Sequence, residues 1–143
     1  MRILAVDPGA KRIGLAVSDP TGTIANPLRV IQHISRPIDA ATIAGIAAEQ
    51  GAGCIIIGTA LGIEGESTLQ SRHAARLAEA IRLQTDLPVE LWDESDSTQA
   101  ARAASIAMGV SAHKRRRQGH AHLDDLAATY LLQSYLDSPN VSR

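Results

Sequence analysis

Aromatic residues are scarce in this chain: they make up 2% of its 143 residues, and phenylalanine is absent. A hydrophobic core must therefore be built mainly from alanine, isoleucine, leucine and valine. Proteins that bind single-stranded nucleic acid without sequence preference stack its bases on aromatic side chains. The composition argues against a site of that kind.

Cysteine and long apolar runs are also nearly absent. Cys54 is the single cysteine and adjoins the apolar run Ile55–Ile57, which predicts a buried, reduced thiol and excludes a disulfide scaffold or a zinc site made of cysteines. No apolar run approaches the roughly 18 residues of a membrane-spanning helix. Met1 and Arg2 lead into a short apolar stretch and not into a secretion signal. We expect a soluble, cytoplasmic protein.

Excess charge of either sign is missing as well. The formal net charge is -1, so any binding of nucleic acid has to depend on local charge and not on the total. The length suits a single domain with one core. We expect that domain over residues 1–137 and a frayed C-terminal tail over residues 138–143.

Hydrophobic periodicity predicts five strands and four helices. We expect the strands at residues 2–7, 12–18, 23–31, 54–58 and 88–92, and the helices at 37–50, 68–84, 98–108 and 122–136. Pro27 restricts the third strand to an edge or a bulge, and Ser67 is the expected N-cap of the second helix. The order predicts an α/β fold with a mixed five-stranded sheet, three antiparallel strands followed by two parallel ones, and helices on both faces.

Acidic residues stand at the ends of two of these strands. Asp7 ends the first strand, where a carboxylate is costly to bury unless a metal or a partner offsets the cost. Taken alone, Asp7 fits a simple Asp-Pro-Gly turn equally well. Asp93 and Glu94 follow the last strand, where open α/β sheets place their sites, although a solvated pair of charges is the simpler interpretation.

Two further acids begin the last helix. Asp124 and Asp125 lie in its first turn, where acids suit the helix dipole. Asp124 shares an apolar stripe with Ala128 and Leu131, whereas Asp125 lies nearer Leu132. Helical periodicity therefore does not choose between the two acids.

Carboxylates at these positions suggest a metal site. Oxygen ligands suit Mg²⁺ or Mn²⁺, whereas zinc favours histidine and cysteine. Two such ions about 3.5–4 Å apart can activate a water and stabilise the leaving oxygen of a phosphodiester.

A basic segment immediately precedes the last helix. Residues 111–122 hold four Lys/Arg, three His and no acid. A solvated loop would explain this segment, but a polyanionic substrate also needs positive charge beside an acidic site. The cations that we expect to contact nucleic acid are Lys11, Arg12, Lys114, Arg115, Arg116 and Arg117.

The glycine-rich loop at residues 62–68 precedes a predicted helix. Backbone N–H groups at such a helix start can hold a phosphate. Glu64 and Glu66 would repel an anion, and the P-loop pattern is absent. The loop is therefore a weak candidate for phosphate binding.

Several of these stretches resemble one known family. The opening ILAVDPGAKRIGLAVSD, the loop IIIGTALGIEGES, the segment LWDESDST and the closing HLDDLAATYLLQSYLD are similar, in order and spacing, to the YqgF/RuvX family of RNase H-like nucleases. That family is associated with Holliday-junction resolution and with the maturation of pre-16S rRNA. The resemblance implies an RNase H-like fold and a nuclease dependent on Mg²⁺ or Mn²⁺.

The resemblance also assigns the site. Asp7 matches the aspartate of the family's first strand, and Glu94 matches the glutamate of its Asp-Glu-Arg pattern. Asp124 matches its final aspartate, because Ala127 and Ala128 set the register. These three acids are then expected to be both the catalytic residues and the metal ligands.

The chain departs from the family pattern in two places. Ser95 replaces the arginine that follows the glutamate, and the proline usual near Ala60 and Leu61 is missing. An arginine at position 95 would be able to clamp a phosphate, so its loss affects the expected affinity or preference for substrate. The three acids are intact.

Four hypotheses follow for function. The first is a metal-dependent endonuclease that processes structured RNA, with the 5′ end of pre-16S rRNA as the first choice. The second is a Holliday junction resolvase acting on branched DNA, which would need paired cuts and hence a homodimer, whereas RNA processing allows a monomer. The third is an ATPase related to the actin and Hsp70 superfamily, and the fourth is a non-catalytic RNA-binding factor in ribosome assembly.

Overall fold

The computed structural model describes residues 1–93 and 123–138, with side chains in the second range from residue 126 on. Its centre is a five-stranded sheet in the order β3-β2-β1-β4-β5. β1, β2 and β3 are antiparallel, and β4 and β5 run parallel to β1. The predicted mixed sheet is confirmed. The strands are β1 (Arg2–Pro8), β2 (Arg12–Ser18), β3 (Ala25–Gln32), β4 (Ala52–Thr59) and β5 (Val89–Asp93).

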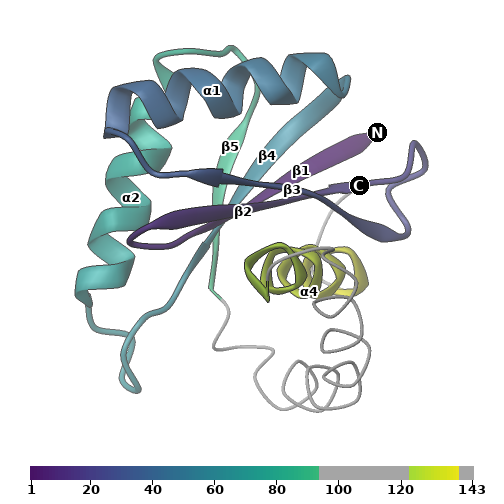
Figure 1. The fold of residues 1–143 in the computed structure, drawn as a ribbon. Helices are drawn as coiled ribbons and strands as arrows, with labels where there is room; N and C mark the ends of the chain where they lie inside the picture. Colours follow the sequence, from purple (N-terminus) through teal and green to yellow (C-terminus); the bar gives the residue numbers. More distant parts are fainter. Residues whose placement is uncertain (94–122, 139–143) are drawn as a thin grey trace.

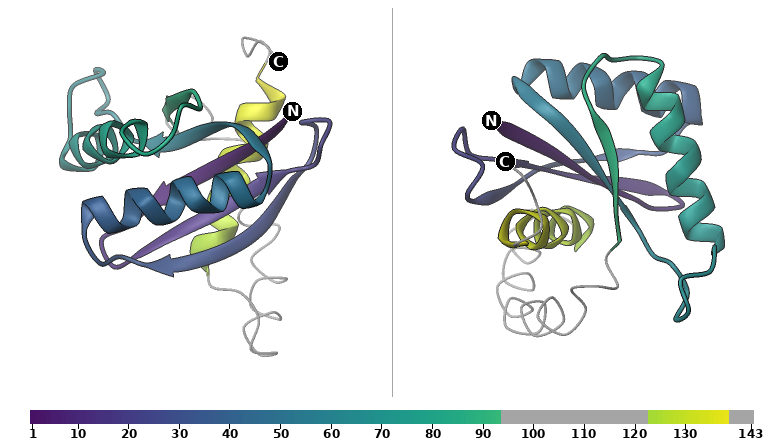
Figure 2. Two further views of the ribbon diagram at one scale, coloured as in Figure 1. Left: turned by 90° about the horizontal axis from the view of Figure 1, so that it is seen from above. Right: turned by 180° about the vertical axis from the view of Figure 1, so that it is seen from behind.

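Helices cover both faces of this sheet (Figure 1). α1 (Arg36–Glu49) and α2 (Leu69–Arg82) pack on one face, and α4 (Leu123–Asp137) crosses the other. The two further views in Figure 2 show the sheet between these layers. The expected helix at 98–108 lies outside the described residues. None of the described helices combines the length and the hydropathy needed to cross a membrane.

The side chains of β1 alternate between two hydrophobic cores. Leu4 and Val6 belong to the core under α1 and α2, whereas Ile3 and Ala5 belong to the core under α4. All four are at most 1% exposed. A strand that is buried on both faces is expected to be apolar throughout, which explains the run that precedes Asp7.

Local signals fix where α1 begins and ends. The Ser35 hydroxyl accepts a hydrogen bond from the Ile38 N–H group at the helix start. At the other end Gly51 has a φ of 66°, a left-handed conformation that glycine adopts without steric cost. The expected stop at Gly51 is confirmed.

The start of α2 differs from the prediction by one residue. Thr68, and not Ser67, is the N-cap. The Thr68 hydroxyl accepts from the Ser71 N–H group at 3.0 Å, and the Ser71 hydroxyl accepts from the Thr68 N–H group at 2.8 Å. Ser71 therefore completes a reciprocal cap with Thr68.

Pro27 lies in β3, an edge strand of the sheet. The pairing of β2 with β3 also shifts register between Leu15 and Ala16, and Ala16 pairs with Pro27. Both expectations for Pro27 are met, because proline lacks the N–H group that regular pairing requires.

Four strands end at one edge of the sheet. β4 and β5 share the direction of β1, and so does β3, because both β1 and β3 pair antiparallel with β2. α1 follows the end of β3 and α2 follows the end of β4. This edge, at Pro8, Gln32, Thr59 and Asp93, is called the carboxyl edge below.

Candidate functional site

Asp7 lies at the carboxyl edge, at the penultimate position of β1, and is half-buried. The alternation along β1 places it on the α4 face, with Ile3 and Ala5. Gly14 is its partner on β2. On the other side of β1 lies β4, and the last residue pair between the two strands is Val6 with Ile57. One step further along this register, Asp7 lies beside Gly58.

The two glycines decide what surrounds the Asp7 carboxylate. Neither Gly14 nor Gly58 has a side chain that could occupy the α4 face next to Asp7. The neighbouring strand positions therefore contribute no side chain beside this oxygen ligand. The donor chemistry of the Asp7 carboxylate fits a hard divalent cation.

The turn after Asp7 depends on another glycine. A Cβ atom on Gly9 would collide with the backbone carbonyl oxygen of Arg12. Lys11 and Arg12, two of the expected nucleic-acid contacts, are exposed in and after this turn. Both cations thus lie at the same edge as Asp7.

Asp93 also lies at the carboxyl edge, but it is on the opposite face. Leu91 and Asp93 line an open hollow of about 350 Å³ with Arg72 of α2. Trp92, between them, packs against the core under α4. Asp93, the last residue of β5, therefore does not share a face with Asp7.

The last helix presents a wide apolar face to the sheet. Ala128 and Leu131, from the stripe of Asp124, are buried, and so is Leu132 from the stripe of Asp125. Both stripes pack inward, so the packing does not choose between the two acids. The side chains of Asp124 and Asp125 are not among those that the structure describes.

The remaining predicted site residues lie outside the described ranges: these are Glu94, Lys114, Arg115, Arg116 and Arg117. Within the described ranges, no three His, Cys, Asp or Glu side chains come close enough together to hold a metal ion. Asp7 is the described member of the expected set of ligands.

The side chain of Glu66 lies within the glycine-rich loop. The Glu66 carboxylate accepts a hydrogen bond from the Glu64 N–H group at 2.9 Å, and a Cβ on Gly62 would collide with that carboxylate. The side chain thus fills the space in which an anion would bind. The loop has no feature that supports phosphate binding.

Cys54 matches its prediction. It is 5% exposed and unpaired with another cysteine. Burial, followed by the charge of Glu90, raises the pKa of the Cys54 thiol to about 11. The thiol is therefore protonated at neutral pH and contributes to packing, not to chemistry.

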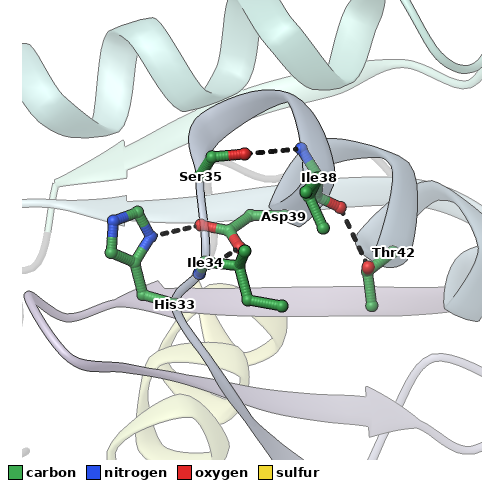
Figure 3. Close-up of polar contacts among 6 residues, drawn as sticks. All are labelled: His33, Ile34, Ser35, Ile38, Asp39 and Thr42. Carbon is green, nitrogen blue, oxygen red and sulfur yellow. Dashed lines mark hydrogen bonds and ion pairs between the residues drawn. The ribbon is translucent and has the colours of Figure 1, made fainter.

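A buried acid that the sequence analysis missed organises the start of α1. Asp39 is 3% exposed, and its carboxylate accepts a hydrogen bond from the Ile34 N–H group at 3.0 Å and contacts the His33 imidazole (Figure 3). The backbone N–H group of His33 donates a hydrogen bond to the backbone carbonyl of Lys11 at 2.9 Å. Through His33, Asp39 thereby connects the β1–β2 turn to the first turn of α1, and these contacts are called the Asp39 clamp below.

Basic residues that the sequence analysis also missed lie near this clamp. Partial burial lowers the pKa of His73 below 6.5, and the charges of Arg36, His33 and Arg76 lower it further, against the opposing effect of Asp39. Positive charge thus gathers where α1 and α2 begin. The sequence carried one signal, since Arg36 is a cation at a helix start, where the dipole disfavours it.

The comparisons with known sequences agree over almost the whole chain. Residues 1–138 match the RuvX family, described as Holliday junction resolvase. A protein of Anaeromyxobacter sp. (strain Fw109-5) named "Putative pre-16S rRNA nuclease" is 37% identical over 137 residues, which are 96% of this chain and 97% of that protein. A protein of the same name from Acidiphilium cryptum (strain JF-5) is also 37% identical, over 99% of this chain and 87% of that protein.

Solved structures share the fold at low sequence identity. RuvC of T. thermophilus, in complex with a Holliday junction substrate, aligns with a TM-score of 0.62 at 13% identity, over 94% of this chain and 92% of RuvC. The Holliday junction resolvase of fowlpox virus aligns with a TM-score of 0.57 at 18% identity, over 96% and 99%. The expected RNase H-like fold is confirmed. The extent of these matches, with the strand order and the position of Asp7, shows that the chain belongs to the RuvX family.

Proposed function

We propose that this RuvX-family protein is a divalent-metal-dependent nuclease that hydrolyses phosphodiester bonds in structured nucleic acid, with the 5′ end of pre-16S rRNA as its first substrate. The observation that carries the proposal is Asp7, a half-buried carboxylate at the carboxyl edge with glycine on both neighbouring strands. The names of the relatives support the choice of substrate. A cytoplasmic location and endonucleolytic cutting belong to the same proposal.

Asp7, Glu94 and Asp124 would hold Mg²⁺ or Mn²⁺. When bound, the metal supplies Lewis-acid activation of water and positive charge for the phosphate. Because Asp93 lies on the other face, Glu94 is the acid after β5 that we assign to the site. The packed sheet orients Asp7, and burial of the neighbouring apolar residues keeps its carboxylate in a fixed position.

The basic residues would position the substrate. Lys11 and Arg12 are exposed beside Asp7, and Lys114, Arg115, Arg116 and Arg117 precede Asp124 in the chain. Phosphate contacts fix the register of a nucleic acid without selecting its sequence. The protein would therefore recognise the shape of its substrate and not its bases.

A second candidate function is the resolution of four-way DNA junctions. The description of the matched family favours it. Symmetric paired cuts require a dimer, whereas the processing of one RNA end does not. The oligomeric state on each substrate therefore separates the two candidates.

Cleavage assays test the proposal directly. Purified wild-type protein and the Asp7→Asn variant are incubated with a structured pre-rRNA fragment and with a four-way DNA junction, with Mn²⁺, with Mg²⁺ and with chelator. We expect metal-dependent cleavage by the wild type. The variant should lose more than roughly a hundredfold in rate, since even residues behind a metal ligand cost 10–100-fold.

Asp86→Asn is the matched control, because Asp86 is an exposed acid outside the site. It should cleave like the wild type. Equal cleavage by wild type and Asp7→Asn would refute the proposed role of Asp7. Binding of RNA without cleavage in any metal would instead favour the non-catalytic assembly factor.

A further inference from the structure

Three basic side chains gather where α1 and α2 begin. Arg36 is the first residue of α1, His73 lies in the first half of α2 and Arg76 lies just past its middle, and α2 packs against α1. Arg36 and Arg76 are exposed, and His73 is half-buried. Arg36, His73 and Arg76 are called the cationic cluster below.

The arginines of this cluster differ from two other exposed arginines of the described residues. Arg29 pairs with Glu49 at 3.3 Å, and Arg82 pairs with Glu79 at 2.7 Å. Arg36 and Arg76 form no ion pair within the described part of the chain. No carboxylate of the described residues therefore neutralises their charge.

The helix dipoles add to this charge. Both helices begin at the carboxyl edge, so their partly positive ends point there. The first turn of α2 contains no acid. The first turn of α1 contains Asp39, whose carboxylate is buried and engaged with Ile34 and His33.

The cluster is connected to the Asp7 side of the edge through the backbone. The hydrogen bond from the His33 N–H group to the Lys11 carbonyl joins the segment before α1 to the turn that follows Asp7. Lys11 is exposed in that turn. Positive groups thus run from the turn beside Asp7 to the starts of the two helices on the other face.

We infer that the cationic cluster binds the phosphodiester backbone of the nucleic acid whose scissile bond lies at Asp7, so that the substrate crosses the carboxyl edge from the α4 face to the α1/α2 face. The inference deepens the proposed function and rests on it for the identity of the substrate. Unpaired exposed cations at one edge are the electrostatic footprint of such a partner. A structured substrate, with more than one helical arm, has backbone to place on both faces.

Salt dependence of binding tests the inference without relying on cleavage. The full chain is titrated, in chelator, against a labelled structured RNA and a labelled four-way DNA junction at several salt concentrations, and affinity is followed by fluorescence anisotropy. The test variant is Arg36→Gln/Arg76→Gln. The matched control is Arg29→Gln/Arg82→Gln, which removes the same charge from the paired arginines.

The salt slope of log K should fall by about one for each phosphate contact that is lost, hence by about two in the test variant. This change corresponds to a roughly ten- to hundredfold loss of affinity at 0.1 M salt. The control should retain the wild-type slope. Arg36→Lys/Arg76→Lys keeps the charge and should restore most of the slope, which excludes a folding defect as the cause.

The two substrates also show which nucleic acid binds the cationic cluster. If the salt slope falls for only one of them, that nucleic acid is the one whose phosphates contact the cluster. An unchanged slope for both substrates overturns the inference, even if the wild type cleaves them. A reduced slope in a protein that cleaves neither substrate supports the binding surface and refutes the proposed activity.

Discussion

The two faces of the sheet carry different sets of charged side chains at the same edge. On the α4 face Asp7 stands half-buried between strand positions occupied by glycine. On the α1/α2 face the edge carries Asp93 together with Arg36, His73 and Arg76, and Asp39 at the start of α1 is buried and engaged. Under the proposed function this difference would separate two tasks of a nuclease, since acids would hold the metal and exposed cations would hold the phosphodiester backbone.

Loss of the Asp39 clamp should affect the two faces unequally. Asp39→Asn removes the buried charge that accepts from Ile34 and contacts His33, which should lower the free energy of unfolding by about 1–3 kcal/mol. Denaturant unfolding can be followed by Trp92, the single tryptophan. Affinity for Mn²⁺ at Asp7 should not change, because the clamp lies on the other face.

Asp86→Asn is the exposed control for that experiment and should leave stability within about 0.5 kcal/mol of the wild type. If Asp39→Asn is equally stable, the hydrogen bonds of this carboxylate do not hold the start of α1. If it also weakens Mn²⁺ binding, the two faces are not independent.

The pKa of His73 should report on the substrate. In the free protein it lies below 6.5, because of partial burial and then the charges of Arg36, His33 and Arg76, with Asp39 opposing them. A bound phosphate backbone would stabilise the imidazolium and raise this pKa. Binding would then take up a proton. The affinity for nucleic acid should therefore increase as the pH falls, and this increase should disappear as the pH rises through the raised pKa.

The expected effect is small, at most about tenfold in affinity for each unit of pKa change. It is measured by NMR titration of the imidazole with and without the RNA, with His73→Gln to assign the resonance and to abolish the pH dependence. An unchanged His73 pKa at saturating RNA would place the substrate elsewhere.

Much of the fold follows from local sequence signals. The apolar runs, Pro27 and Gly51 each carry a signal that can be recognised in the local sequence: a short run without polar residues, a missing N–H group and a glycine suited to a left-handed turn. The cap of α2 was misplaced because Ser67 and Thr68 are adjacent hydroxyls, and only the reciprocal bond with Ser71 separates them.

The site was less predictable, because it depends on which face each side chain occupies. Asp93 and Glu94 are equivalent as sequence, and only the register of β5 assigns Asp93 to the α2 side. The packing of α4 does not distinguish Asp124 from Asp125, because the helix stripes of both residues are buried. Arg36 and Arg76 are far apart in the chain, and only the packing of α1 on α2 reveals the cationic cluster.

Metal binding by three proteins tests the central claim, which is that the acid on the α4 face, and not the acid on the opposite face, holds the catalytic cation. Mn²⁺ is titrated by calorimetry into the wild type, Asp7→Asn and Asp93→Asn. The account predicts that Asp7→Asn loses more than roughly a hundredfold in affinity, whereas Asp93→Asn stays within about threefold of the wild type. Equal affinities for wild type and Asp7→Asn, or a larger loss in Asp93→Asn, would contradict it.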